Sequence, residues 1–194
     1  EELAQSGEQN RLTHFFYFQL GAAYERNRQY NTASKIFNKA LNLFPEYHNA
    51  MNYLGYMWVD IDRNIDEAAE LIKKANELDP ENAAYIDSLG WLYFRQGKYD
   101  KALIELLRAS ELTKEEPDST IFEHIGDTHQ KLGDTKKAKV AWKKALDLLI
   151  KQKKKEQEPD AYLFEQIGNI YNKLGQEAKA KDAWKRSYDI TPIE

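Results

Sequence analysis

Hydrophobic side chains recur along this chain in two alternating patterns, and both have the period of an α-helix. The first pattern begins with a large side chain, places Leu or Ile and then Gly three and four residues later, and ends with a ring at the seventh. It occurs five times, at Tyr17–Tyr24, Met51–Trp58, Ile86–Tyr93, Phe122–His129 and Phe164–Tyr171. Spacings of three, four and seven put these residues on one stripe of a helix, which we call helix A.

The second pattern follows each helix A and starts with an alanine. A large residue comes four places after the alanine, and a small residue comes seven places after it. The alanines that start it are Ala33, Ala68, Ala102, Ala138 and Ala180. This spacing predicts a second helix, helix B, which a proline follows each time because its ring cannot continue a helix. Breaker segments such as Arg95–Lys98, with a glycine suited to a left-handed turn, predict the end of helix A.

The glycine of helix A recurs at intervals of 34, 35, 36 and 42 residues, from Gly21 to Gly168. A glycine inside a helix costs about 1 kcal/mol relative to alanine. Its recurrence at one point predicts that helix B packs closely against it. We therefore expect Gly55, Gly90 and Gly126 to lie against a partner helix.

These patterns resemble the tetratricopeptide repeat, a helix-turn-helix unit of about 34 residues. The resemblance covers residues 14–194 and implies an all-α, right-handed solenoid of five such repeats. The stretch from Asn52 to Ala109 is similar to bacterial members of the family. We place the repeats at 14–47, 48–82, 83–118, 119–160 and 161–194, after a lead-in or remnant of an earlier repeat at 1–13.

Two repeats depart from the pattern. Repeat 2 has one extra residue, which we place in the turn Asp60–Asn64. Repeat 4 carries about two additional helical turns over Leu149–Glu158, with four lysines. Nearby carboxylates partly cancel those lysines, so we favour a solvated helix extension over a phosphate-binding or membrane-binding patch.

The resemblance implies that helix A lines a concave groove, chiefly through the residues three before and one after each glycine. None of these residues is Lys or Arg, which argues against the cationic clamp that some family members use for carboxylates. We therefore expect a non-catalytic protein–protein interaction scaffold that binds a basic or apolar peptide segment of a partner protein in this groove. Tyr56 and Trp91 are the expected apolar anchors for the segment. Its basic groups would pair with Asp87, Glu123, Asp127 and Glu165. The full set of expected groove residues is Phe18, Asn52, Tyr56, Asp87, Trp91, Glu123, Asp127, Glu165 and Asn169.

Composition narrows the classes of function. The 28 basic and 32 acidic residues leave no basic excess of the kind that nucleic-acid binding requires. The chain has no cysteine, which excludes disulfides, thiol catalysis and cysteine-ligated metals. No apolar run is long enough to span a bilayer. The carboxylates Glu123, Asp127 and Glu165 would need a desolvated pocket to act as acid and base, and His124 and His129 point to different sides of a helix. We therefore predict no catalytic residue, no metal site and no cofactor.

Two alternatives to a peptide-binding scaffold stay open. In one, exposed terminal faces, with Ala183, Trp184 and Tyr188 in the last turns, drive homo-oligomerisation. In the other, the chain is an accessory part of a cell-envelope enzyme. The start at Glu1 is consistent with a removed signal or with a piece of a longer array, so the sequence leaves the compartment, the partner and the pathway undefined.

Overall fold

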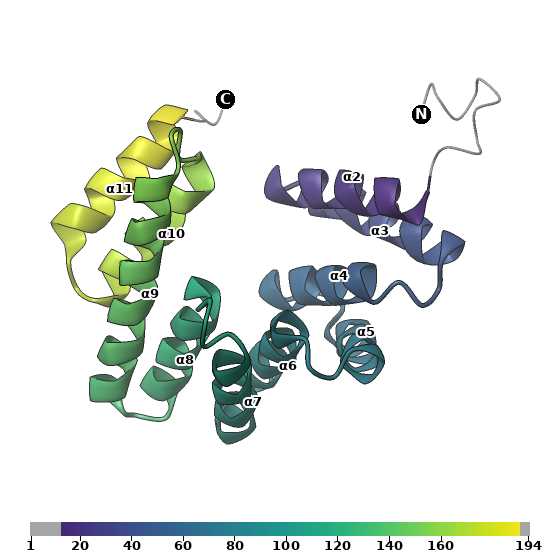
Figure 1. Cartoon of the computed structure of the whole chain (residues 1–194), viewed down its shortest axis with the longest axis horizontal. Helices are drawn as coiled ribbons and strands as arrows, with labels where there is room; N and C mark the ends of the chain where they lie inside the picture. Colours follow the sequence, from purple (N-terminus) through teal and green to yellow (C-terminus); the bar gives the residue numbers. More distant parts are fainter. Residues whose placement is uncertain (1–12, 191–194) are drawn as a thin grey trace. The chain divides into compact units, whose positions relative to one another are not determined.

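A computed structural model describes residues 13–190, and these form ten α-helices and no strand. The helices divide between two compact units that meet in sequence at Lys98 and Tyr99 (Figure 1). Unit 1 contains α2 (His14–Arg26), α3 (Tyr30–Leu43), α4 (His48–Asp60), α5 (Ile65–Leu78) and α6 (Ala83–Arg95). Unit 2 contains α7 (Tyr99–Leu112), α8 (Ser119–Lys131), α9 (Thr135–Lys155), α10 (Ala161–Lys173) and α11 (Glu177–Ile190). Even-numbered helices carry the helix A pattern and odd-numbered helices the helix B pattern, as the sequence predicted.

Unit 1 is built from two helical hairpins and a fifth helix. Helix α2 pairs with α3, α4 pairs with α5, and α6 packs against both α4 and α5. The A helices α2, α4 and α6 contact one another in sequence order, and so form a row. Fully buried side chains between the helices include Phe37, Leu54, Ile72 and Leu92.

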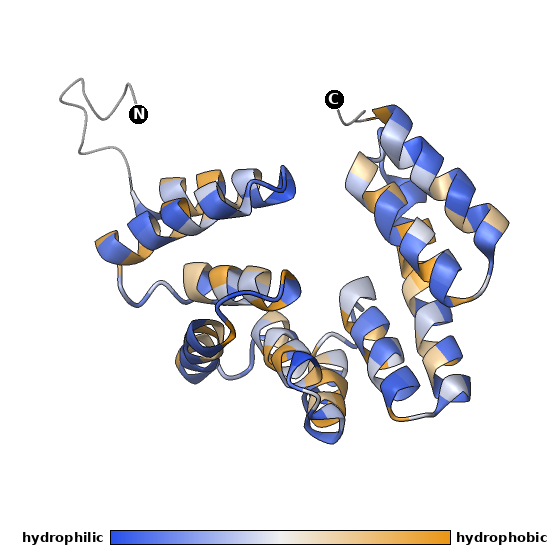
Figure 2. Ribbon diagram, turned by 180° about the vertical axis from the view of Figure 1, so that it is seen from behind, coloured by the Kyte–Doolittle hydropathy of each residue, from blue (hydrophilic) through white to orange (hydrophobic). Residues whose placement is uncertain are grey.

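Unit 2 repeats the hairpin arrangement. Helix α8 pairs with α9 and α10 with α11, while α7 packs on α8 and α9 packs on α10. Helices of both units carry apolar and polar sides (Figure 2), and the buried side chains of unit 2 include Trp142, Leu149, Leu163 and Ile170. Burial of the apolar sides supplies most of the stability of such short helices.

The extension of repeat 4 is helical, as predicted, but the helix ends at Lys155 and not at Glu158. Helix α9 has 21 residues, whereas the other B helices have 14. Leu149, where the extension begins, is buried, and Lys151, Lys154 and Lys155 near its end are exposed. The extension thus adds both core contacts and a solvated basic end.

Four of the five helix A glycines, Gly21, Gly55, Gly126 and Gly168, pack against helix B. A Cβ built on Gly126 would lie 2.3 Å from Cδ1 of Trp142, and one on Gly168 would lie 2.4 Å from Cδ1 of Trp184. Gly55 faces Ile72 at 2.8 Å in the same way, and Gly90 is buried. At Gly55, Gly126 and Gly168 a larger residue would therefore displace the helix B side chain or push the two helices apart, which confirms the packing reason inferred from the repeat. The contact of Gly90 with helix B stays a prediction.

The turns between helices A and B lie where the glycine breaker segments predicted the end of helix A. Gly97, Gly133 and Gly175 adopt left-handed conformations with φ between 73° and 83° in three-residue turns. The turn from α4 to α5 has four residues, which confirms the extra residue of repeat 2. It contains no glycine, and Asp62 and Asn64 take the left-handed positions with φ of 58° and 46°.

The sequence analysis expected Ala183 and Trp184 on an exposed terminal face, and this expectation is wrong. Ala183 is 4% exposed, and Trp184 is partly buried and packs over Gly168, because both side chains face the companion helix α10. Only Tyr188 and Ile190 of this helix are large apolar residues with exposed side chains. Pro192 and the lead-in at 1–12 lie outside the described residues.

Candidate functional site

The A helices of unit 1 carry five of the expected groove residues. Phe18 lies on α2, Asn52 and Tyr56 lie on α4, and Asp87 and Trp91 lie on α6. Because α4 contacts both α2 and α6, these positions fall on neighbouring helices, as the repeat register requires. We call the side of α2, α4 and α6 that carries these five residues the A-helix face of unit 1.

The aromatic residues of this face differ in accessibility. Phe18 packs against the rings of Phe37, Tyr47 and Tyr53, so it mainly serves the core. Trp91 is only 8% exposed and stacks on Phe94 with 4.5 Å between ring centroids. Tyr56 is partly exposed. Of the two predicted anchors, Tyr56 therefore offers the more accessible ring.

Asn52 has a feature that its sequence position did not reveal. Its side chain is 8% exposed, and no donor among the described residues hydrogen-bonds to its buried Oδ1. A buried acceptor without a donor costs about 1–3 kcal/mol. This oxygen is shielded from solvent, so a ligand N–H group reaches it only when neighbouring side chains move, and the new hydrogen bond would then recover that free energy.

The carboxylates of unit 2 are held by a lysine. Lys173 Nζ donates to Glu123 Oε1 at 2.6 Å and to Asp127 Oδ2 at 2.7 Å. Lys173 closes α10, whereas both carboxylates lie on α8. Burial of the ammonium lowers the pKa of Lys173, but attraction by Glu123 and Asp127 outweighs this effect and leaves the pKa above the ordinary lysine value.

Lys173 is not among the groove residues that the sequence predicts. The residues three before and one after each glycine contain no cation, but Lys173 lies five residues after Gly168, on the next turn of the helix. Its long side chain reaches back to the preceding A helix. The sequence signal for it is the position five residues after the glycine, one helical turn beyond the groove positions, where repeats 4 and 5 both carry a lysine.

In unit 2, the residue after each helix A glycine also forms a hydrogen bond with helix B. Asp127 Oδ1 accepts a hydrogen bond from Nε1 of Trp142 at 2.9 Å, and Asn169 Oδ1 accepts one from Nε1 of Trp184 at 3.0 Å. Asp127 and Asn169 thus position the indoles that cover Gly126 and Gly168. Glu165, on α10, is partly buried.

A second polar network joins the N-terminal ends of α4 and α6. The buried hydroxyl of Tyr85 donates to Asn49 Oδ1 and lies 2.7 Å from Nδ1 of His48. Burial, with Asp79 and Tyr47 as further causes, raises the pKa of Tyr85 to about 12. From α5, Asn76 donates to the backbone oxygen of Tyr85 and so holds α6 in place.

The described residues contain no group of three or more His, Cys, Asp or Glu side chains placed to hold a metal ion. His124 is buried, whereas His48 belongs to the tyrosine network. Between Thr13 and Ile190, no helix combines the length and the apolar composition that crossing a bilayer requires.

Three family models, each described as a tetratricopeptide repeat, match the chain. They cover residues 14–47, 62–117, 120–148 and 161–193. The chain belongs to the tetratricopeptide repeat family. This membership confirms the resemblance that the glycine and alanine patterns indicated, together with the all-α repeat fold.

Among known proteins, the chain is similar to two from Pseudomonas aeruginosa. It is 39% identical over 83 residues to a TPR repeat-containing protein, covering 43% of this chain and 14% of that protein. It is 28% identical over 132 residues to the type IV pilus assembly protein PilF, covering 68% of this chain and 52% of PilF. The chain therefore spans at most about half the length of these relatives.

A thermophilic TPR protein of Thermus thermophilus has a similar structure. The match has a TM-score of 0.70 at 18% identity and covers 94% of this chain and 93% of that protein. At this level of identity the likeness shows the fold.

Proposed function

We propose that this protein is a non-catalytic scaffold that binds a basic or apolar peptide segment of another protein. Membership in the tetratricopeptide repeat family indicates a protein–protein interaction scaffold. The observation that supports peptide capture on unit 1 is the pairing of Asn52 and Tyr56 on α4. One helical turn separates a buried oxygen that lacks a donor from a partly exposed ring.

A peptide supplies what both groups require. Each residue other than proline carries a backbone N–H, which can satisfy the Oδ1 of Asn52. An apolar side chain of the same segment can pack on the ring of Tyr56, and aromatic residues commonly dominate binding energy at such interfaces. Asp87 and Trp91 on α6 complete the proposed face, although both are largely buried.

Unit 2 supports the basic character of the ligand, but less strongly than the sequence suggested. Glu123 and Asp127 share Lys173, so their two negative charges are offset by one positive charge. The cluster of Glu123, Asp127 and Lys173 keeps a net charge of −1. A residual negative potential of this kind speeds the encounter with a basic segment more than it adds affinity.

The test is selection of a random peptide library on the full chain, followed by affinity measurement with the selected synthetic peptides. We expect Tyr56→Ala to weaken binding about tenfold or more, because an aromatic anchor is lost. Tyr188→Ala removes an exposed ring from α11 and is the matched control, with affinity unchanged. Equal affinity for the Tyr56→Ala and Tyr188→Ala variants would remove Tyr56 from the proposed site.

Asn52→Leu separates binding from folding. Leucine has a similar shape and removes the buried oxygen, so the variant should be at least as stable as the natural protein. It should nevertheless lose affinity for the selected peptides. Unchanged affinity would show that Asn52 does not meet a ligand donor.

Homo-oligomerisation is the second candidate, and the exposed side chains of Tyr188 and Ile190 on α11 favour it. Light scattering over a wide concentration range tests this candidate. Association that a Tyr188→Ser/Ile190→Ser variant abolishes would support it, and a monomer at every concentration would eliminate it.

A further inference from the structure

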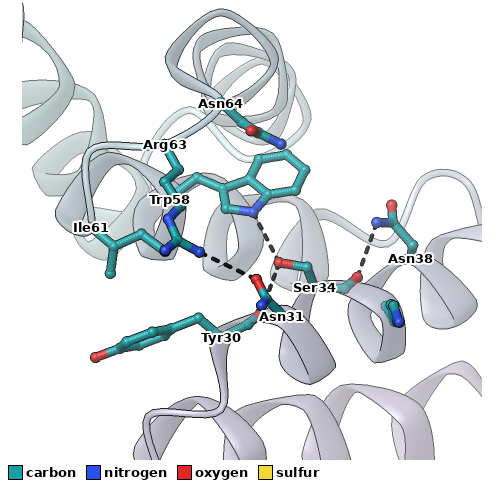
Figure 3. Close-up of a pocket in the computed structure, with 9 residues that line it drawn as sticks. Tyr30, Asn31, Ser34, Asn38, Trp58, Ile61, Arg63 and Asn64 are labelled. Atoms are coloured by element: carbon teal, nitrogen blue, oxygen red, sulfur yellow. Dashed lines mark hydrogen bonds between the residues drawn. The ribbon is translucent and has the colours of Figure 1, made fainter.

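Unit 1 contains an open pocket of about 620 Å³ (Figure 3). One side of α3 forms its floor, through residues that include Asn31, Ser34 and Asn38. Trp58 of α4 forms a wall, and Arg63 and Asn64 of the α4–α5 turn form its rim. None of these residues belongs to the groove set that the repeat register predicts.

Hydrogen bonds hold the polar walls of this pocket in place. Trp58 Nε1 donates to Ser34 Oγ at 2.9 Å, and the Ser34 hydroxyl donates to the backbone oxygen of Tyr30. Asn38 Nδ2 donates to the backbone oxygen of Ser34 at 2.9 Å. Side chains that are already ordered lose little conformational entropy when a ligand binds.

The side chains of Arg63 and Asn31 both line the pocket and contact each other. Arg63 Nη1 donates to Asn31 Oδ1 at 3.2 Å, which leaves the amide Nδ2 of Asn31 and other N–H groups of the guanidinium as donors. These donors, with the oxygen of Asn38, can pair with the polar groups of a peptide backbone. The indole of Trp58 offers a surface for an apolar side chain.

The pocket is cationic within an acidic half of the chain. Lys35 and Arg63 line it, and its lining, as the structure describes it, includes no carboxylate. Residues 1–97 carry 9 basic and 14 acidic residues, so this local excess of positive charge is a departure from its surroundings. The adjacent carboxylate of Asp62 lies 3.3 Å from the guanidinium of Arg95, which offsets its charge.

The extra residue of repeat 2 helps to build this pocket. The four-residue turn brings Arg63 and Asn64 to the rim, and it holds Asp62 and Asn64 in left-handed conformations without glycine. Left-handed backbone costs non-glycine residues roughly 1–2 kcal/mol each, less for Asp and Asn. Such strain commonly persists at functional sites.

We propose that this pocket binds a carboxylate of an acidic peptide segment, with an adjacent apolar side chain of that segment on Trp58. Lys35 and Arg63 pair with the carboxylate, and Asn31 and Asn38 hydrogen-bond the backbone. This site lies beyond the peptide-binding function proposed for the A-helix face and has ligand chemistry of the opposite charge. One chain would thus have two interaction surfaces that select different partners.

The experiment uses the full chain and the indole N–H resonance of Trp58, identified through a Trp58→Phe spectrum. The probe is a capped heptapeptide of glutamates around one phenylalanine, compared with the same peptide carrying glutamines. We expect the glutamate peptide to shift the Trp58 resonance saturably and the glutamine peptide to leave it in place. Lys35→Gln and Arg63→Gln should each weaken the apparent affinity about fivefold, as expected for partly exposed charge pairs.

Lys74→Gln is the matched control, because Lys74 is exposed on α5, lies outside the pocket lining, and changes the net charge equally. An equal loss in Lys74→Gln would show a net-charge effect and overturn the proposal. A shift produced in full by inorganic phosphate would overturn the assignment to a peptide, and no saturable shift would overturn the site. Retained binding in Asn52→Leu would show that this pocket acts independently of the A-helix face.

Discussion

The ammonium of Lys173 lies 2.7 Å from Oδ2 of Asp127, and this contact joins two residues that are 46 positions apart in sequence. The same ammonium contacts Glu123, and Asp127 also accepts the indole N–H of Trp142. Through these bonds the end of α10 is tied to the middle of α8. The network therefore links repeat 4 to repeat 5 within unit 2.

Lys173→Met should destabilise the protein by about 2 kcal/mol at pH 7. Glu123 and Asp127 would then be left close together without a cation, and Lys173 is 26% exposed, so solvent screens part of the loss. Urea denaturation measures the change. Lys131→Met is the control, since Lys131 has the same register in repeat 4 and is exposed.

The cost of Lys173→Met should depend on pH. Because the pKa of Lys173 is raised in the folded state, its contribution is complete below the ordinary lysine pKa of about 10.4 and is lost as the pH rises through the folded value. The natural protein and the variant should thus converge in stability above that pH. A difference that stayed constant from pH 7 to pH 11 would contradict this account.

Asp127→Asn should cost less stability than Asp127→Ala, by about 1 kcal/mol. Repeat 5 already uses an asparagine, Asn169, to hold the indole of Trp184, so an amide oxygen can also accept from Trp142. Alanine would leave that indole N–H without its acceptor. Thermal or urea unfolding of both variants checks the order, and equal losses would show that the indole bond contributes nothing.

Gly126→Ala should destabilise unit 2 by about 2 kcal/mol, because the new methyl group overlaps the ring of Trp142. A second substitution identifies the cause: in a Trp142→Leu background, Gly126→Ala should cost less. Gly133→Ala meets no atom within 4 Å but has a φ of 83°, so its cost of about 1 kcal/mol should be the same in both backgrounds. A double-mutant cycle measures both couplings, and absence of coupling for Gly126 would contradict the close packing.

The stability of the protein should fall between about pH 10 and pH 12 because of Tyr85. Its pKa is raised to about 12 in the folded state, compared with about 10 for an ordinary tyrosine, so the unfolded chain releases the proton first. This contribution is complete below pH 10 and is lost as the pH rises through 12. Tyr85→Phe should remove this part of the pH dependence, whereas Tyr188→Phe, at an exposed ring, should not. Circular dichroism during urea unfolding at several pH values makes the comparison.

The sequence by itself determined the helices, their pairing and the irregularities of the repeat. The glycine of helix A and the large residue of helix B are 16 or 17 residues apart within one hairpin, so their contact follows from local spacing and a short turn. The extra residue before Asn64 and the extension of α9 were visible for the same reason, since each adds length to one local element. Each of these features is set by residues close together in sequence, so the chain has few alternative ways to arrange them.

Only the tertiary structure decided how side chains of different repeats meet. The reach of Lys173 to Asp127, the missing donor at Asn52 and the pocket between α3 and Arg63 each depend on how neighbouring hairpins pack. The same is true of Trp184, whose ring the sequence placed on an open face and the fold places over Gly168. A repeat pattern specifies which side of each helix is apolar, but long polar side chains select their partners from whatever the packed neighbours bring within reach.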